Sequence, residues 1–268
     1  MKAIQSLQKE NTVRGLLSFL YGVAAYVACL AALLYFIAFS GNLVVPKSVD
    51  VGGDAAWFEA VVTDLLLLAL FGVQHSLMAC QGFKRWWTRI VPPPVERSTY
   101  VVATCAVLAL MFCFWVPIAA PVVWQVERTP GITILRTLFG LGWVLVVLST
   151  FLLNHFELFG LQQVFARLTR RVMPEAQFRT PMLYRFVRHP LYLGLLLGLW
   201  SMPVMTAGHL LFSLGLSLYI LIGISFEERD LLQQFGERYR TYRQQVGMLI
   251  PRGKLSRRNA GRAAGRAK

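Results

Sequence analysis

The sequence predicts an all-α integral membrane protein with four transmembrane helices, a C-terminal helical hairpin and a cytoplasmic amphipathic helix. Charged residues make up only 15% of its 268 residues, whereas globular proteins average about 25%. The mean hydropathy is +0.54. Several apolar runs also approach the roughly 20 residues that a helix needs to cross a bilayer. Together these observations exclude an ordinary soluble enzyme.

Four apolar segments precede the hairpin, and loops rich in glycine, proline or charge separate them. The expected spans are Leu16–Phe39, Trp57–Cys80, Tyr100–Val116 and Ile132–Phe156. We expect the fourth to continue through Glu157 toward Leu168. The four cysteines lie in or beside these apolar segments without metal-like spacing, so they are expected to be packing residues.

The hairpin is expected to begin at a helix break at His189. Pro190 lacks a backbone N–H and fits the first helical turn, and it disfavours helical angles at His189. At 1.5 Å per residue, the ascending part would be about 16 Å long if it ended at Ser201 and about 25 Å if it continued to Ala207. We favour the longer version because it closes the hairpin neatly. The descending part, Leu210–Phe226, then returns to the membrane face of His189.

The descending part delivers the acidic pair Glu227 and Glu228 to the end of the hairpin. From Glu228 to Val246, apolar residues follow one stripe and arginines the other, which predicts an amphipathic helix on the lipid surface. The basic, Gly/Ala-rich residues 252–268 predict a disordered tail. We therefore expect one membrane domain over residues 1–251, followed by this tail.

The net charge of +14 lies mostly in loops and tail. In a soluble protein it would suggest nucleic acid, but here anionic lipid explains it better, and no nucleic-acid partner is expected. Basic residues concentrate between the second and third spans, and between the fourth span and the hairpin. By the positive-inside rule, both termini are cytoplasmic and the hairpin opens to the cytosol.

Four groups of polar residues stand out, because ionisable side chains at membrane depth are costly and often functional. The groups are Arg188-His189 with Tyr192, Glu227 and Glu228; Gln74-His75-Ser76; Asn154-His155-Phe156-Glu157, leading to Gln162-Gln163; and Thr206 with His209. A helix start after Pro190 suits an anion. The histidines lack i, i+4 spacing, so no metal site is expected.

Each group also has a structural explanation. Glu227 and Glu228 are typical of surface ion pairs with nearby arginines. His75 is equally consistent with a buried histidine bonded to a neighbouring helix. The Asn154 group fits a solvated helix end, and Thr206 and His209 fit turn and cap residues. What favours function is that most of these side chains are expected in the cytoplasmic half of the membrane.

The motif Arg188-His189-Pro190-Leu191-Tyr192-Leu193-Gly194, followed by Glu227-Glu228-Arg229-Asp230-Leu231, resembles the isoprenylcysteine carboxyl methyltransferase and phospholipid methyltransferase type of membrane enzyme. The His75 and His155 segments and residues 200–212 resemble the bacterial methanethiol S-methyltransferases more closely. Gly247 departs from the pattern, since such proteins often have proline there. NnrU-like membrane proteins share the two histidine segments.

The resemblance implies S-adenosylmethionine as methyl donor and a small volatile thiol as acceptor, in a bacterial inner membrane. The expected cofactor residues are Arg188, His189, Tyr192, Gly194, Glu227 and Glu228. The expected catalytic residues are His75 or His155, with Asn154 and Glu157. The expected substrate contacts are Ser76, Trp200, Thr206 and His209. A neutral histidine would remove the thiol proton, because the thiolate is the nucleophile.

The leading functional hypothesis is methylation of methanethiol to dimethyl sulfide, with hydrogen sulfide as a further candidate acceptor. Two alternatives stay open at this point: methylation of a larger lipid or prenyl substrate, and a non-catalytic NnrU-like accessory role. The sequence leaves open the exact acceptor, the histidine that acts as base, the hairpin register and the oligomeric state.

Overall fold

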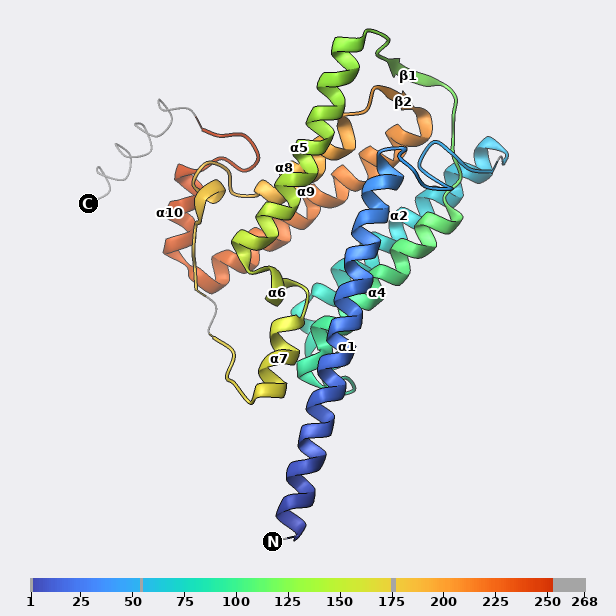
Figure 1. The fold of residues 1–268 in the computed structure, drawn as a ribbon. Helices are drawn as coiled ribbons and strands as arrows, with labels where there is room; N and C mark the ends of the chain where they lie inside the picture. Colours follow the sequence, from blue (N-terminus) through green and yellow to red (C-terminus); the bar gives the residue numbers. More distant parts are fainter. Residues whose placement is uncertain (1, 54, 175–176, 253–268) are drawn as a thin grey trace, which may run out of the picture. The chain divides into compact units, whose positions relative to one another are not determined.

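The computed structural model describes residues 2–53, 55–174 and 177–252, with side chains from Thr12 onward (Figure 1). Within these ranges, five helices are long and apolar enough to cross a membrane. They are α1 (Lys2–Ser40, apolar from Thr12), α2 (Trp57–Ala79), α4 (Pro93–Phe114), α5 (Thr129–Leu153) and α9 (Ala207–Phe235). The predicted all-α membrane fold is confirmed: α1, α2, α4 and α5 are the four expected spans, and α9 is the descending part of the hairpin.

Shorter elements connect these helices. They are α3 (Gln81–Trp87), α6 (His155–Leu158), α7 (Leu161–Thr169), the 3-10 helix η1 (Met182–Arg185), α8 (Pro190–Trp200), α10 (Glu237–Gln245) and the strands β1 (Val122–Gln125) and β2 (Val204–Thr206). Apart from Arg252, the expected disordered tail lies outside the described residues.

The described chain forms two compact units. The first comprises the described parts of Met1–Gln125, Asn154–Glu175 and Val204–Gly215, and the second those of Val126–Leu153, Ala176–Pro203 and Leu216–Lys268. Helix α9 therefore begins in the first unit and continues in the second. A single domain over residues 1–251 stays a prediction.

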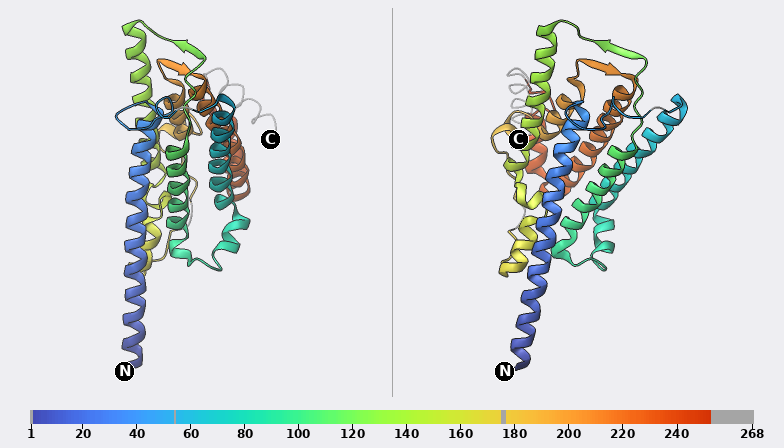
Figure 2. Two further views of the ribbon diagram at one scale, coloured as in Figure 1. Left: turned by 90° about the vertical axis from the view of Figure 1, so that its right-hand side faces the viewer. Right: turned by 45° about the vertical axis from the view of Figure 1, so that its right-hand side comes forward.

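In the first unit, α1 lies beside α4 and α7, and α2 packs on α4 (Figures 1 and 2). The close approach of α1 and α7 depends on glycine, because a Cβ at Gly22 would lie 2.5 Å from a methyl group of Val164. An aromatic cluster packs at the C-terminal end of α1. Trp115 lies 6.4 Å from Phe39 and 5.2 Å from Phe212, measured between ring centroids, and all three side chains are fully buried.

A small sheet that the sequence did not predict also belongs to the first unit. Strand β1 pairs antiparallel with β2, with Val122 opposite Thr206 and Gln125 opposite Val204. The pairing continues beyond the strands, because Gly208 donates its N–H to the carbonyl of Ile118 at 2.9 Å. The start of α9 is thereby fixed to the chain that follows α4.

In the second unit, α5 packs along α8, and two facing glycines bring their backbones together. A Cβ at Gly142 would lie 2.7 Å from the carbonyl oxygen of Gly194, and one at Gly194 would lie 2.6 Å from that of Gly142. The missing side chain of Gly194 thus makes room for the backbone of α5, and its expected contact with the cofactor stays a prediction.

The preference for a long ascending helix was wrong. Helix α8 ends at Trp200, and the chain continues as β2. Pro203 explains this ending, since proline cannot donate the next helical hydrogen bond and disfavours helical angles at the preceding residue. With 11 residues, α8 is about 16 Å long, well short of the roughly 30 Å hydrocarbon core.

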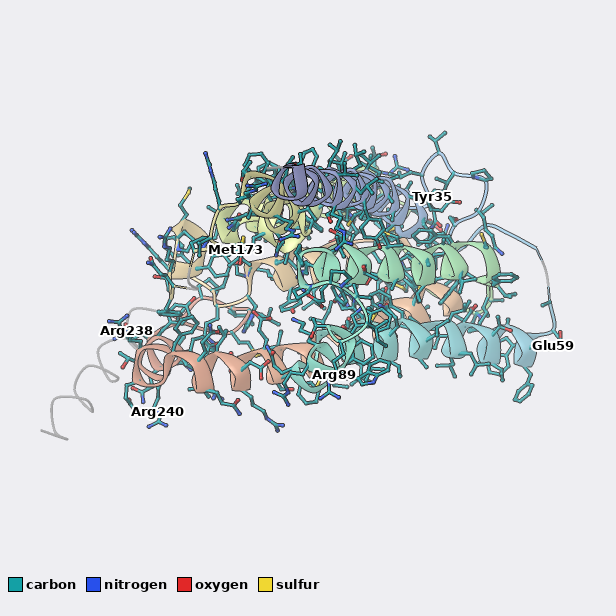
Figure 3. The ribbon with its side chains drawn as sticks, turned by 90° about the horizontal axis from the view of Figure 1, so that it is seen from below. Tyr35, Glu59, Arg89, Met173, Arg238 and Arg240 are labelled. Atoms are coloured by element: carbon teal, nitrogen blue, oxygen red, sulfur yellow. The ribbon has the colours of Figure 1, made fainter. Side chains whose placement is uncertain are left out.

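Two other expected helices are interrupted at residues with positive φ. The fourth span does not run on toward Leu168, because Asn154 has a φ of 113° and Gly160 a φ of 88°, which separate α5, α6 and α7. The expected helix Glu228–Val246 is divided at Gly236, with a φ of 53°, between α9 and α10. Left-handed angles suit glycine and asparagine better than other residues. Arg238 and Arg240 project outward from α10 (Figure 3), as expected of its arginine face.

Candidate functional site

The predicted hairpin motif forms a buried ion-pair cluster in the second unit. Arg188 approaches one oxygen of Glu228 through Nε at 2.8 Å and through Nη2 at 2.7 Å. His189 Nε2 lies 3.2 Å from the same oxygen, while Arg243 Nε lies 3.1 Å from the other, Oε2. Arg188, His189 and Glu228 are all buried. We call these four residues the Arg188–Glu228 cluster.

The same cluster holds the chain that follows α10. Arg188 Nη1 donates to the carbonyl oxygen of Val246 at 2.6 Å, and the backbone N–H of Arg188 donates to Gly247 at 2.8 Å. A Cβ at Gly247 would clash with the carbonyl oxygen of Ile250, so the backbone leaves no room for a side chain at this position. Since both carboxylate oxygens of Glu228 are engaged by cations, the cluster fastens the start of α8 to α9 and to the chain after α10.

Glu227, the neighbour of Glu228, stays accessible. Its side chain is 42% exposed, against 9% for Glu228. Tyr192, one turn into α8, donates its hydroxyl proton to Glu227 Oε2 at 3.0 Å, and His189 Nδ1 lies 3.9 Å from the same oxygen. Glu227 therefore presents a carboxylate at the mouth of the hairpin, and the hydrogen bond from Tyr192 holds this carboxylate in place.

Backbone donors lie beside this carboxylate. His189 is the residue before α8, with a φ of −126°, and Pro190 occupies the first helical position, as predicted. The His189 carbonyl accepts the hydrogen bond from the Leu193 N–H at 3.0 Å, which is the first hydrogen bond of the α8 turn. The N–H group of Leu191, in the first turn of α8, thus has no acceptor within the helix and suits an anionic group. The Glu227 carboxylate therefore favours a cationic group of a ligand, and the start of α8 favours an anionic group.

Buried tyrosines surround the cluster. Burial, aided by the charge of Glu227, raises the pKa of Tyr184, and burial raises the pKa of Tyr242 to about 12 against an opposing effect of Arg188. Tyr242 donates its hydroxyl proton to the carbonyl of Tyr184 at 2.6 Å. These phenols are therefore neutral at physiological pH and do not offset the charge of Arg188. Tyr239 is the most deeply buried of these tyrosines, with 1% of its surface exposed.

The first predicted histidine, His75, is bonded through both ring nitrogens in the first unit. Nε2 lies 2.7 Å from the Tyr100 hydroxyl and Nδ1 lies 3.3 Å from Thr104 Oγ1. Thr104 donates its own proton to the carbonyl of Tyr100 at 3.0 Å, so it accepts from Nδ1–H and leaves Nε2 to accept from the Tyr100 hydroxyl. The structural explanation, a histidine bonded to a neighbouring helix, therefore describes His75 well, although the residue is only half-buried.

The second predicted histidine, His155, also meets a tyrosine in the first unit. Its Nε2 lies 2.7 Å from the hydroxyl of Tyr26 on α1, and the ring packs 4.9 Å from Phe159, measured between ring centroids. Burial lowers the pKa of His155 below its ordinary value. The ring is therefore neutral at physiological pH and retains basic character.

Asn154 and Glu157 organise the helix break beside His155. The Asn154 amide donates to Glu157 Oε2 and to Gln162 Oε1, each at 2.7 Å. The hydrogen-bond partner of Glu157 here is thus Asn154, whereas His155 is positioned by Tyr26. The catalytic role expected of Glu157 stays a prediction.

Arg97 connects the two histidine segments. Its Nε donates to the carbonyl oxygen of Leu158 at 2.7 Å, and its guanidinium lies 4.9 Å from the centroid of the Tyr100 ring. Tyr100 holds His75, and Leu158 ends the short helix of His155. The two histidines therefore share one polar framework in the first unit.

Thr206 and His209 lie at the start of α9, where they meet an aspartate. Thr206 Oγ1 accepts the backbone N–H of His209 at 3.0 Å, which is what a capping residue does. His209 Nδ1 lies 2.9 Å from Asp50 Oδ2, and Asp50 also accepts hydrogen bonds from Thr206 and Asn42. Burial opposes the ionised carboxyl, but these donors outweigh it and lower the pKa of Asp50.

The other predicted contacts are placed as follows. Ser76 is exposed on α2, and Trp200 donates its indole N–H to Ser217 on α9 at 2.9 Å. His75 and His155 belong to the first unit and the Arg188–Glu228 cluster to the second. Their convergence on one substrate, like the assigned role of each site residue, stays a prediction. Among the described residues, no group of three or more His, Cys, Asp or Glu side chains is arranged to hold a metal ion.

Sequence reasoning missed several partners of these residues. They are Tyr26, Asp50, Arg97, Tyr100, Tyr184 and Arg243. Asp50 alone carried a signal, as an acidic residue in a short loop of a protein with only 13 acidic residues. The tyrosines and arginines resemble many others in the chain, and only the fold selects them.

No family model and no solved structure matches this chain. Curated relatives do. The chain is 52% identical to Methanethiol S-methyltransferase 1 of Bradyrhizobium diazoefficiens over 235 residues, which cover 88% of this chain and 82% of that protein. It is 50% identical to Methanethiol S-methyltransferase of Mycobacterium tuberculosis over 235 residues, 88% of this chain and 96% of that protein. Nurim of Bos taurus is 33% identical over 185 residues, 66% of this chain and 70% of that protein.

The matched regions cover most of the chain, and the identity to the first two relatives is far above the level at which a fold alone is shared. The resemblance inferred from the motifs is thereby confirmed. With its hairpin cluster, its histidine segments and its five apolar helices, the chain belongs to the methanethiol S-methyltransferase family.

Proposed function

We propose that this protein is a membrane enzyme that transfers the methyl group of S-adenosylmethionine to methanethiol, giving dimethyl sulfide. The observation that carries the proposal is the identity of 50–52% over 88% of the chain to relatives named for methanethiol S-methylation. The same match argues against a non-catalytic accessory role and against a larger lipid or prenyl acceptor. Methyltransferases need a methyl donor, and the donor assignment rests on the chemistry of the hairpin.

The residues at the hairpin mouth fit the amino-acid end of S-adenosylmethionine. Glu227 offers an accessible carboxylate for its ammonium group. The backbone N–H of Leu191, in the first turn of α8, suits its carboxylate. Tyr192 keeps the Glu227 side chain in place through its 3.0 Å hydrogen bond. Glu228, already engaged by Arg188, His189 and Arg243, positions this site and does not itself need to touch the donor.

Bound at this site, S-adenosylmethionine supplies an electrophilic methyl group on a positively charged sulfur. The acceptor has to be the thiolate, because a neutral thiol is a poor nucleophile. In the balanced reaction, the thiol proton goes to a base, a new carbon–sulfur bond forms, and S-adenosylhomocysteine leaves with the electron pair of the broken bond. An in-line displacement of this kind depends mainly on alignment and exclusion of water.

His155 is our preferred base. It is neutral because burial lowers its pKa, and it lies at the polar helix break of Asn154. His75 has both ring nitrogens engaged by Tyr100 and Thr104, which suits a residue that holds the framework. The Tyr26 hydroxyl, 2.7 Å from His155 Nε2, is placed to relay a proton to the ring.

We also propose a bacterial inner-membrane location with both termini in the cytosol, because basic residues concentrate in the loops after α2 and α7. The hairpin mouth would then face the compartment that holds S-adenosylmethionine. Reporter fusions at either terminus, active only in the cytosol, test this orientation. Signal from a periplasmic reporter at either end would contradict it.

The activity is tested with the purified protein in lipid vesicles, given methanethiol and S-adenosylmethionine labelled with three deuterons on the methyl group. We expect headspace mass spectrometry to detect dimethyl sulfide that carries three deuterons. Glu227→Gln should greatly reduce this product. The matched control is Glu237→Gln, which removes an exposed carboxylate paired with Arg240 on α10 and should leave turnover unchanged. Absence of labelled dimethyl sulfide from the unmodified protein would reject the proposal.

A further inference from the structure

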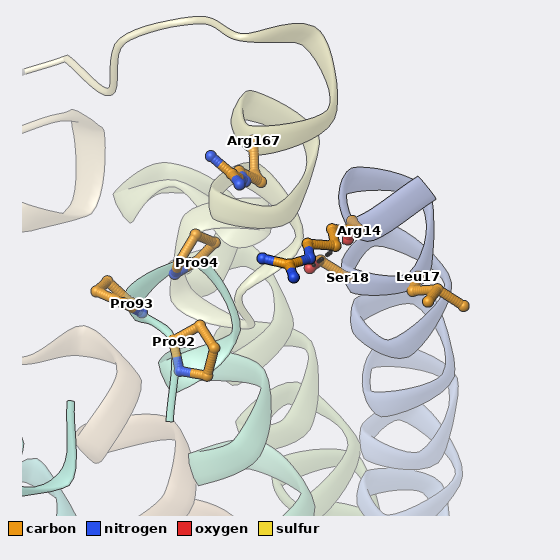
Figure 4. A pocket seen from close by; sticks show the side chains of 7 residues that line it. All are labelled: Arg14, Leu17, Ser18, Pro92, Pro93, Pro94 and Arg167. Atoms are coloured by element: carbon orange, nitrogen blue, oxygen red, sulfur yellow. Dashed lines mark hydrogen bonds between the residues drawn. The ribbon is translucent and has the colours of Figure 1, made fainter. Parts of the chain in front are cut away.

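A basic pocket in the first unit lies apart from every group discussed above. It opens where α1, α7 and the proline-rich start of α4 meet, and has a volume of about 520 Å³ (Figure 4). Its lining residues are Arg14, Leu17, Ser18, Pro92, Pro93, Pro94 and Arg167. Such a volume is within the usual range for small-ligand sites.

Helix packing brings the two arginines to one opening. A Cβ at Gly15 would lie 3.5 Å from the Cα of Leu168, and Phe19 meets Phe165 with ring centroids 6.3 Å apart. Together with the contact of Gly22 on Val164, these contacts align α1 with α7 over two turns. Arg14 precedes the first of these glycines and Arg167 precedes Leu168, so both arginines flank the same contact.

The chemistry of the lining favours an anion. Arg14 and Arg167 are both exposed, and in Figure 4 the guanidinium of Arg14 points from α1 toward the prolines, below that of Arg167. Ser18 Oγ donates to the carbonyl of Arg14 within α1 at 2.9 Å. Proline has no N–H, so Pro92–Pro94 contribute an apolar wall. None of the seven lining residues is acidic.

The position of the pocket favours an amphiphile over a free anion. The apolar part of α1 begins at Thr12, so Arg14 lies at the level where the chain enters the membrane. In the turns of α1 around Arg14, Val13, Leu17 and Leu20 are exposed by 48%, 61% and 55%. Their spacing of four and three residues places them on one face of the helix. An anionic group held by Arg14 would thus continue into an apolar track.

We propose that this pocket binds the headgroup of an anionic phospholipid, with the phosphate between Arg14 and Arg167 and an acyl chain along Leu17 and Leu20. Arginine recognises phosphate through paired, charge-assisted hydrogen bonds. The lipid would clamp α1, α7 and the start of α4 together at the membrane surface. This inference is independent of the proposed methyl transfer.

The test uses the full-length protein in neutral detergent and titrates it with phosphatidylglycerol, while native mass spectrometry counts the bound lipids. We expect one lipid to be retained by the unmodified protein. The variant with Arg14→Gln and Arg167→Gln should bind it at least about tenfold more weakly. The control with Arg85→Gln and Arg89→Gln removes the same charge from exposed positions at and after α3 and should lose no more than about twofold. A variant with lysine at positions 14 and 167 should retain part of the binding, because charge remains but the planar fork is lost.

A second readout is thermal stability, because a lipid that binds only the folded protein raises its unfolding temperature. Phosphatidylglycerol should raise the Tm of the unmodified protein and of the control, but not that of the Arg14/Arg167 variant. Phosphatidylcholine and inorganic phosphate should have little effect on any of them. Equal losses in both double variants would show that general surface charge binds the lipid, and an equal effect of inorganic phosphate would show a free-anion site. Either result would overturn the proposal.

Discussion

The hydroxyl of Tyr192 on α8 donates a 3.0 Å hydrogen bond to Glu227 on α9, one residue before the buried Glu228. Two adjacent acidic residues thus have different surroundings. Glu228 is enclosed by Arg188, His189 and Arg243, whereas Glu227 is 42% exposed. This difference assigns a fastening role to Glu228 and a ligand-facing role to Glu227, and it leads to separate expectations for their variants.

Glu228→Ala should destabilise the protein, and Glu227→Ala should not. Removing Glu228 leaves Arg188 buried without its carboxylate, which typically costs about 3–5 kcal/mol of folding free energy. Glu227 is accessible, so its loss should change stability by less than about 0.5 kcal/mol. Thermal unfolding in detergent compares the two variants. Equal Tm losses would contradict the distinction between them.

His155→Ala should lower kcat by about 10²- to 10⁴-fold, the usual contribution of a general base. Tyr26→Phe should lower kcat less, because the ring remains but loses its hydrogen-bond partner. Tyr21→Phe is the matched control, since Tyr21 also lies on α1 but its hydroxyl bonds Thr99, at 3.2 Å. Initial rates at saturating methanethiol are the measurement. If the Tyr26 and Tyr21 variants behave alike, the proposed relay through Tyr26 fails.

The pH profile offers a further check on His155. Its pKa in the folded protein lies below the ordinary value of about 6.5, so the basic form should predominate above pH 6.5. We expect kcat to be nearly independent of this group from pH 8 to 6.5 and to fall at lower pH, as the ring gains a proton. The His155→Ala variant should lack that inflection. An inflection assigned to His155 above pH 6.5 would show that the ring is not held neutral by burial.

Asp50→Asn should weaken the fold in a pH-dependent way. The folded-state pKa of Asp50 is lowered, so its contribution to stability is present above the unfolded value of about 3.9 and is lost as pH falls through the folded value. The Tm difference between unmodified protein and variant should therefore be constant near neutral pH and shrink below about pH 4. Glu59→Gln, at an exposed carboxylate in the first turn of α2 (Figure 3), is the control. A Tm difference that grows as the pH falls would contradict this prediction.

Gly194→Ala should disturb the packing of α5 on α8. The added methyl group would lie 2.6 Å from the Gly142 carbonyl oxygen, and backbone cannot move aside as a flexible side chain can. Overpacking of this kind typically costs about 1–3 kcal/mol. Gly140→Ala on α5 meets nothing within 4 Å and should be neutral or slightly stabilising, because alanine favours helix. The measurement is the unfolding temperature of each variant. A Gly194→Ala protein as stable as the unmodified protein would contradict this account of the packing.

Much of the hairpin could be predicted from local chemistry. Pro190 fixes where α8 starts. The cost of unpaired charge in a membrane favours the return of Glu228 to Arg188, although the length of α8 was not predicted correctly. The four spans are likewise set by the length of their apolar runs. These features depend on residues that are near in sequence or opposite in charge, so they can be predicted from the sequence directly.

Other parts depend on tertiary contacts that no local pattern contains. The break at Asn154 requires a left-handed angle that asparagine tolerates but does not demand, and the amide is then used by Glu157 and Gln162. The pairing of β1 with β2 joins segments 79 positions or more apart. The tyrosine partners of the histidines are chosen by helix packing. Sequence reasoning therefore found the histidines but not the hydroxyls that hold them.

The account depends most on Glu227 as a contact of the methyl donor. Isothermal titration of S-adenosylmethionine into the detergent-solubilised protein tests this directly, with Glu227→Gln and Glu237→Gln compared side by side. We predict binding to the unmodified protein and to Glu237→Gln with equal affinity, and at least about tenfold weaker binding to Glu227→Gln, the loss expected for one charge-assisted hydrogen bond. Unchanged affinity in a correctly folded Glu227→Gln protein would contradict the account.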